Sequence, residues 1–326
     1  YNYLAIITSF IFYSTDCEVF MKQETIVVRH LKKSYGQKNV TDDISITFYS
    51  SQIVAIVGHN GAGKSTFLNQ INGTVASDEG TIHIKGVDVT KQPGKARELV
   101  SSMPQFQVPI KGVTVQEAIK CIGAVKGMNS SAVESRTKEL IDFLEINQWK
   151  HTAGEKLSGG LQRLTSFAMS VVDIPSILVL DEPTNDVDPF RRTLIWRYLR
   201  SLANLGTTVI IVSHNLFEVE RYADRYLLFD KGRIKRDVLV SESKNARQLK
   251  HQVSLSGVNK EELFHFLNHN NLKYDDVEKR LIFTVSEDCF TEVISVIFDL
   301  LKTDRIVSYE IKLRTLSDDY EEYINE

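Results

Sequence analysis

The chain has 326 residues, of which 42% are hydrophobic and 25% charged, a balance typical of a soluble globular protein. Its 39 Lys and Arg against 42 Asp and Glu give a net charge of −3, which argues against a general nucleic-acid binder because such proteins usually carry a basic excess. Three scattered cysteines without CxxC spacing argue against a disulfide framework or a zinc cluster and favour a reducing compartment.

Residues 1–20 precede Met21, and their longest apolar stretch, residues 1–13, already contains Asn2, Thr8 and Ser9. The stretch is shorter than the roughly 18–20 apolar residues of a membrane span, and it lacks the basic start and cleavage site of a signal peptide. We expect residues 1–20 to be an extension outside the core fold. The alternative is the tail of a transmembrane segment from a longer chain.

From about Thr25, short apolar runs alternate with helical stretches, which predicts an α/β domain with a mostly parallel sheet over residues 21–240. Thr114, with Glu117 three residues later, predicts a capped helix start. Earlier runs at 26–28 and 44–48 favour antiparallel edge strands. Three runs rich in β-branched residues predict strands that are buried on both faces. They lie at residues 53–57, 177–180 and 209–212.

A polar stretch, Ser241–Arg247, predicts a linker over about residues 241–250. The remaining residues, 251–326, alternate apolar runs and helical periodicity in the order strand, helix, strand, strand, helix, strand, which predicts a small α+β ferredoxin-like module. A last short helix is expected at 315–324. The predicted strands lie at 253–255, 281–285 and 306–311, and the helices at 263–267 and 293–301.

Residues 58–65 match the pattern G-x-x-x-x-G-K-[ST] completely, between a predicted buried strand and a predicted helix. Glycines let successive backbone N–H groups turn toward phosphate oxygens, and the helix start adds positive potential. Lys64 supplies a charge for the β- and γ-phosphates, and the Ser65 hydroxyl can ligate Mg²⁺. The residues predicted to hold the nucleotide phosphates are Gly58, His59, Asn60, Gly61, Ala62, Gly63, Lys64, Ser65 and Thr66.

Asp181 and Glu182 follow directly after a predicted central strand. Ligands of parallel α/β sheets gather at the carboxyl ends of strands. Downstream of a phosphate-binding loop, this position predicts Asp181 as a Mg²⁺ ligand and Glu182 as the group that accepts a proton from the attacking water.

Residues Leu157–Gly160 read Leu-Ser-Gly-Gly and precede a helical run. With this segment the chain resembles the ATP-binding subunit of an ABC transporter, over about residues 25–240. The resemblance implies a P-loop ATPase core with a mixed sheet, an antiparallel β subdomain and a helical subdomain. The matching elements, in order, are Tyr35, the phosphate-binding loop, Gln105, Leu157–Gly160, Asp181 with Glu182, Asp188 and His214.

The resemblance also implies roles in nucleotide binding. Tyr35 matches an aromatic residue that stacks on adenine, although a partly buried strand-end tyrosine is the alternative. Gln105 matches a glutamine that senses Mg²⁺ and water, with Gln107 only two residues away. His214 matches a histidine that hydrogen-bonds the γ-phosphate, which makes Glu182, His214, Lys64 and Gln105 the expected catalytic residues.

Two segments match parts that act across a dimer. Ser158, Gly159 and Gly160 match a signature that contacts the ATP bound to a second copy, and Asp188 matches a loop at the dimer interface, where it also suits a helix N-cap before Pro189. The sequence departs from the family pattern at Leu161 and in residues 185–187, but no essential position is missing. We therefore expect an active, ATP- and Mg²⁺-dependent ATPase that forms a homodimer around ATP.

The resemblance further implies a polytopic membrane permease as partner, contacted through about Phe106–Met128, and a place on the cytoplasmic side of the cell membrane. The final module is similar to that of ATPases serving ABC-2-type exporters, which favours export and a structural or dimer-supporting role over small-ligand sensing. A soluble ABC-type ATPase in DNA repair, translation or cofactor assembly is the alternative, although the chain has one phosphate-binding loop and no long coiled coil. No nucleic-acid partner is expected.

Overall fold

The computed structural model describes residues 23–105, 111–243, 250–257, 273–275 and 280–325. Residues 1–20, which we expected to lie outside the core, fall outside the described part. Within that part, none of the helices combines the length and the apolar character that a membrane crossing requires.

The central sheet has six strands in the order β10-β9-β3-β8-β7-β6. All neighbouring pairs are parallel except β9 with β10, so the sheet is mixed, as predicted. The three predicted buried strands, β3, β7 and β8, are fully buried, and their carboxyl ends lead into the candidate site. The strand bounds are Gln52–Val57 (β3), Ser101–Met103 (β6), Ile177–Asp181 (β7), Thr208–Val212 (β8), Arg225–Asp230 (β9) and Arg233–Leu239 (β10).

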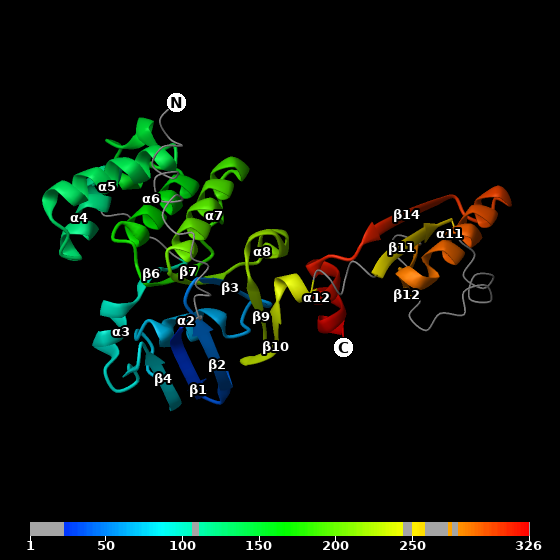
Figure 1. Cartoon of the computed structure of the whole chain (residues 1–326), viewed down its shortest axis with the longest axis horizontal. Helices are drawn as coiled ribbons and strands as arrows, with labels where there is room; N and C mark the ends of the chain where they lie inside the picture. The colour runs from blue at the N-terminus through cyan, green and yellow to red at the C-terminus, as the bar shows by residue number, and fades with distance from the viewer. Residues whose placement is uncertain (1–22, 106–110, 244–249, 258–272, 276–279, 326) are drawn as a thin grey trace, which may run out of the picture.

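A second, antiparallel sheet has the order β2-β1-β4-β5. The two predicted strands are antiparallel, as expected, but only β2 lies at an edge, because β1 pairs with β2 on one side and with β4 on the other. The sheet shares a hydrophobic core with one face of the central sheet. Figure 1 shows it in blue and cyan at the lower end of the core. Its strands are Glu24–Tyr35 (β1), Lys38–Tyr49 (β2), Glu79–Ile84 (β4) and Val87–Asp88 (β5).

Helices α4, α5 and α6 gather at the opposite end of the core (Figure 1). The predicted capping box at the start of α4 is present, because the Thr114 side chain bonds the Glu117 N–H and the Glu117 side chain bonds the Thr114 N–H. The helices of the core are Lys64–Ile71 (α2), Pro93–Leu99 (α3), Val115–Val125 (α4), Ser130–Phe143 (α5), Gly159–Val171 (α6), Pro189–Asn204 (α7) and Leu216–Tyr222 (α8), with short 3₁₀ turns at Asn147–Trp149 and Gly154–Lys156.

The C-terminal module is an antiparallel sheet of order β12-β13-β11-β14 with helix α11 packed against it. This is the strand order of a ferredoxin-like fold, as predicted. The predicted helix at 263–267 lies outside the described residues. The bounds are Lys250–Ser256 (β11), Lys273–Asp275 (β12), Arg280–Ser286 (β13), Glu287–Lys302 (α11) and Ser308–Leu313 (β14).

The last helix, α12 (Leu316–Asn325), leaves this module and packs on the ATPase-like core. Leu316 is buried in the core's main hydrophobic cluster, and its N–H donates to Glu220 Oε2 of α8 at 3.3 Å. Figure 1 shows α12 in red beside α8. The start of the expected linker also differs from expectation, because residues 240–243 form a helical turn in which Val240 is buried.

Candidate functional site

The phosphate-binding loop connects the buried strand β3 to helix α2, as predicted. Gly63, at the start of α2, has φ +103°, and a Cβ there would lie 2.1 Å from the Val40 carbonyl oxygen. A side chain is therefore excluded both by conformation and by space. The first N–H groups of a helix have no partner within it, so the start of α2 offers donors to an anion.

Lys64 is folded onto its own loop. Its Nζ donates to the carbonyl oxygens of Gly58 at 2.6 Å and His59 at 2.9 Å. Burial lowers the pKa of the Lys64 ammonium, and the nearby Glu182 and Asp181 carboxylates oppose that effect. The lysine is thus held at the mouth of the loop, close to the acidic pair.

The acidic pair lies at the end of β7, where the sequence predicted it. Asp181 and Glu182 are 7% and 2% exposed, and burial raises the pKa of Asp181 and brings that of Glu182 to about 7. Glu182 has a left-handed backbone, φ 52°, and its N–H donates to Val212 O of the neighbouring β8 at 3.1 Å. The turn at Glu182 is thus joined by its backbone to the end of β8.

His214 follows β8 and meets Glu182. The His214 Nε2 and Glu182 Oε1 atoms are 3.0 Å apart, and the His214 side chain is 45% exposed. Burial, reinforced by the charge of Lys64, lowers the pKa of His214, which leaves the imidazole neutral near pH 7. The structure therefore brings Lys64, Asp181, Glu182 and His214 together at one sheet edge.

One oxygen of the acidic pair, Asp181 Oδ1, is buried without a hydrogen-bond partner, and the Ser65 hydroxyl lowers the pKa of the Asp181 carboxyl group. Buried oxygens without partners are costly unless a cation or proton occupies them. Within the described chain, no three His, Cys, Asp or Glu side chains are grouped to hold a metal. A hydroxyl and a single carboxylate fit Mg²⁺, which takes its other ligands from phosphates and water.

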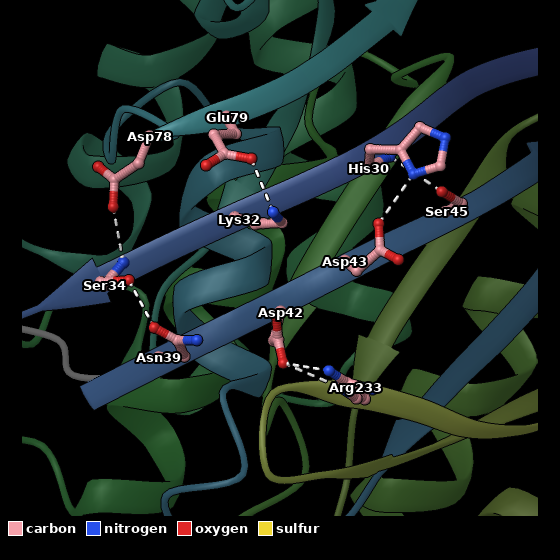
Figure 2. Close-up of polar contacts among 10 residues, drawn as sticks. All are labelled: His30, Lys32, Ser34, Asn39, Asp42, Asp43, Ser45, Asp78, Glu79 and Arg233. Atoms are coloured by element: carbon pink, nitrogen blue, oxygen red, sulfur yellow. Dashed lines mark hydrogen bonds and ion pairs between the residues drawn. The ribbon is translucent and has the colours of Figure 1, made fainter. Parts of the chain in front are cut away.

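Tyr35 stands exposed at the end of β1, with 54% of its surface accessible. Its neighbour Ser34 is fixed by two contacts, shown in Figure 2: the Ser34 N–H donates to Asp78 Oδ2 at 2.7 Å and its hydroxyl donates to Asn39 Oδ1 at 2.8 Å. Lys33 Nζ lies 5.5 Å from the Tyr35 ring centroid. The ring is thus presented to solvent and not buried at the strand end.

The signature begins helix α6. Ser158 is its N-cap, and its Oγ accepts from the Leu161 N–H at 3.4 Å. Ser158 and Gly159 are exposed. Gly160 lies against the turn after β7, so that a Cβ on Gly160 would be 2.3 Å from Asp186 O. In the described part of the chain no hydrogen bond or ion pair joins Ser158–Gly160 to the phosphate-binding loop.

Asp188 caps helix α7, because its Oδ1 accepts from the Arg191 N–H at 3.0 Å, which confirms the N-cap interpretation. Its side chain stays 44% exposed. The predicted Gln105 follows β6 and is half-buried, whereas the alternative Gln107 lies outside the described residues.

Two residues of the site escaped the sequence analysis. Arg163 of α6 donates to Gln105 O at 2.8 Å, and its charge lowers the pKa values of Asp181 and Glu182. Asp230, at the end of β9, lies 3.0 Å from His59 Nε2 of the phosphate-binding loop. Arg163 lies three residues after Gly160, so its closeness to the signature was the available signal, whereas Asp230 gave none.

Comparison with known proteins places the site in a family. A family model described as ABC transporter matches residues 41–185. The Nod factor export ATP-binding protein I of Paraburkholderia xenovorans is 34% identical over 213 residues, which cover 65% of this chain and 70% of that protein. This chain belongs to the ABC transporter family. The Nod factor export ATP-binding protein I of Sinorhizobium fredii is 36% identical over 208 residues, 64% of this chain, and the chain spans only 61% of that relative's length.

Solved structures confirm the fold of this ABC family member. An ATP-binding subunit of an ABC transporter superposes with a TM-score of 0.64 at 22% identity and covers 75% of this chain and 100% of its own. A nucleotide-free ATP-binding cassette gives 0.61 at 24% identity, over 76% and 100%. The predicted P-loop ABC core, with its mixed sheet, antiparallel subdomain and helical subdomain, is therefore correct.

Proposed function

We propose that this chain binds ATP with Mg²⁺ and hydrolyses it to energise export through separate membrane subunits. One observation carries the proposal: Lys64, the buried pair Asp181 and Glu182, and His214 converge at the carboxyl edge of one sheet, with a Glu182 pKa of about 7. A carboxylate that titrates near neutral pH is suited to act as a general base.

Each residue of the site has its own role in the proposed hydrolysis of ATP. Lys64 exchanges the carbonyl oxygens of its loop for the β- and γ-phosphates, and the amides at the start of α2 bind phosphate oxygens. Bound Mg²⁺, held by Ser65, Asp181 and Gln105, would neutralise phosphate charge. Glu182 takes a proton from the attacking water, and His214 positions the γ-phosphate beside it.

The proposed active form is a dimer of two copies. Ser158 and Gly159 are exposed at the start of α6, and Asp188 is exposed at the start of α7, so all three are free to reach ATP bound to a second copy. Tyr35 of the first copy stacks on the adenine. Exposed signature residues and a separate phosphate-binding loop support a site completed by two chains.

The proposed location is the cytoplasmic face of the cell membrane, with a polytopic permease docked near residues 106–128, where Val125 of α4 is 77% exposed. We retain residues 21–240 as the ATPase domain and 251–326 as an accessory region with a structural role, apart from α12, which packs on the core. The names of the relatives favour export, and cargo choice is assigned to the permease.

Co-purification tests the transporter role. The tagged chain is isolated from detergent-solubilised membranes of its own cell, and co-purifying proteins are identified by mass spectrometry. A stoichiometric polytopic membrane protein is expected. Recovery from the soluble fraction together with nucleic acid, ribosomes or assembly factors would overturn this role and promote a soluble ABC-type ATPase.

A second experiment tests the chemistry. Glu182→Gln should abolish ATP hydrolysis by the chain assembled with its permease while ATP binding persists. Glu134→Gln, on the exposed face of α5, serves as the matched control and should hydrolyse ATP at the wild-type rate. Equal hydrolysis by the Glu182→Gln and wild-type chains would refute the assignment of the base.

A further inference from the structure

A buried carboxylate that the proposed chemistry does not use lies just behind the site. Glu218 is in α8, four residues after His214, and is 6% exposed. Burying a carboxylate costs several kcal/mol unless hydrogen bonds or charges compensate it. An apolar side chain would fill the same space without that cost, so the partners of this carboxylate indicate what it does.

Those partners come from two other segments. Glu218 Oε2 accepts hydrogen bonds from Thr184 Oγ1 and from Trp196 Nε1, both at 2.9 Å. Thr184 lies two residues after Glu182, in the turn after β7, and Trp196 lies in α7. Arg192 Nη1, also from α7, is 3.8 Å from Glu218 Oε1. The carboxylate thus joins the turn that carries Glu182 to helices α7 and α8.

The same helix is tied to His214. The residue after His214, Asn215, caps α8 by accepting from the Glu218 N–H at 3.2 Å, and the Asn215 N–H donates to Ser213 Oγ at 3.1 Å. A displacement of His214 therefore moves the cap of a helix only seven residues long, and with it the Glu218 carboxylate.

The connection continues to the signature. Arg192 Nε donates to Val187 O at 2.6 Å, and Asp186 O lies against Gly160 with no room for a Cβ. Contacts therefore run without a break from His214 through Glu218 to the turn at 182–188, and from that turn to the start of α6.

We propose that Glu218 is a positioning residue that makes the segment after β8 and the turn after β7 move as one unit, so that the γ-phosphate contact at His214 sets the position of Glu182. The inference rests on the proposed ATP hydrolysis. Two donors from separate segments bond one buried oxygen. Because the dielectric constant is low inside the protein, losing either hydrogen bond would leave a buried polar group unsatisfied at a high cost in free energy.

Thr184→Val tests the link without touching Glu218, since it keeps the side-chain shape and removes the hydroxyl. In the chain assembled with its permease, kcat should fall about tenfold or more with KM for ATP changed less than about twofold, because the base is misplaced and binding is intact. Thr184→Ser, which restores the hydroxyl, should recover most of the rate.

The control is Thr207→Val. Thr207 is equally buried and donates one hydrogen bond, to Pro175 O at 2.7 Å, but it precedes β8 at the end of the strand away from the site. Its kcat should match the wild type. Equal losses in the two valine variants, or no rescue by serine, would overturn the proposal, whereas absent hydrolysis in the wild type would refute the proposed function instead.

Trp196 offers a readout independent of turnover. The chain has two tryptophans, so Trp149→Phe leaves Trp196, which bonds Glu218, as the sole one. With ATP binding verified by equilibrium dialysis, ATP should shift the Trp196 emission, and Thr184→Val in the same background should reduce that shift. An emission unchanged by bound ATP, or an equal shift in both chains, would overturn the proposal.

Discussion

Glu182 combines two unfavourable features in one residue. Its backbone is left-handed and its carboxylate is buried. Backbone strain of this kind clusters at functional sites, where the surrounding structure holds it in place. Here the N–H bond to Val212 O fixes the turn, so the fully buried strands β7 and β8 maintain the strained geometry.

The Glu182 pKa of about 7 predicts a pH dependence of the reaction. A general base must be deprotonated, so kcat/KM for ATP should rise with pH through about 7 and level off above it. Steady-state rates of the permease-bound chain between pH 5.5 and 8.5 would measure this. Rates that stay flat over this range, as a base with the ordinary glutamate pKa of 4.5 would give, would contradict it.

The same shift predicts that Glu182→Gln is stabilising at high pH. The folded state keeps the Glu182 proton up to about pH 7, whereas the unfolded chain loses it near 4.5, so wild-type stability falls as pH rises between these values. The glutamine chain avoids that loss and should gain about 2 kcal/mol at pH 8. Urea unfolding should show the gain shrinking at pH 5.5, and a gain independent of pH would contradict this origin.

Which site residues the sequence revealed depended on how local their signals are. Lys64, Asp181 and Glu182 sit in short motifs beside apolar strands, and the structure brings them together as expected. Asp230 and Glu218 act on partners brought near by folding. The His59–Asp230 contact joins residues 171 positions apart, and no local pattern encodes such a pair.

The same distinction holds for helices and strands. Composition predicted the buried strands β3, β7 and β8, and residue spacing predicted the capping box of α4. β6 has three residues, Ser-Ser-Met, and is a strand because it pairs with β7. Helix α8 is too short to show a helical period, although Asn215, which caps it, is a residue type typical of helix starts.

The start of α6 provides a prediction about packing. Gly160→Ala should destabilise the chain by about 1–3 kcal/mol, because its Cβ would meet the Asp186 carbonyl 2.3 Å away and backbone must shift. Gly159→Ala is the matched control, since its nearest neighbour atoms lie 3.9 Å away. Urea denaturation of both variants would separate them, and equal stabilities would contradict the close contact.

At the scale of the whole molecule, helix α12 follows the C-terminal module and packs on the core. Leu316 is 3% exposed and belongs to the core cluster that also contains Leu180 and Ile211. A last short helix was predicted at 315–324, but its destination could not be read from the sequence because the contacted surface of α8 is formed only by folding.

Leu316→Ala should therefore lower the free energy of unfolding of the core by about 2–4 kcal/mol, as removal of a buried leucine does. Leu313→Ala, at the last residue of β14 and 53% exposed, should change it by less than about 0.5 kcal/mol. Thermal unfolding monitored by Trp196 fluorescence would measure both. Similar effects of the two variants would show that α12 does not support the core.

The packing of α12 on the core predicts the effect of nonsense mutations that remove this helix. The Leu316 N–H donates to Glu220, 96 residues earlier, so the core receives this contact only after the strands of the C-terminal module have been translated. A premature stop codon just before Leu316 would leave the motifs for ATP and the strands of the C-terminal module encoded. The protein would nevertheless lack α12, the helix that packs on the core. In genetic terms, nonsense alleles at this position should behave as defects of the core.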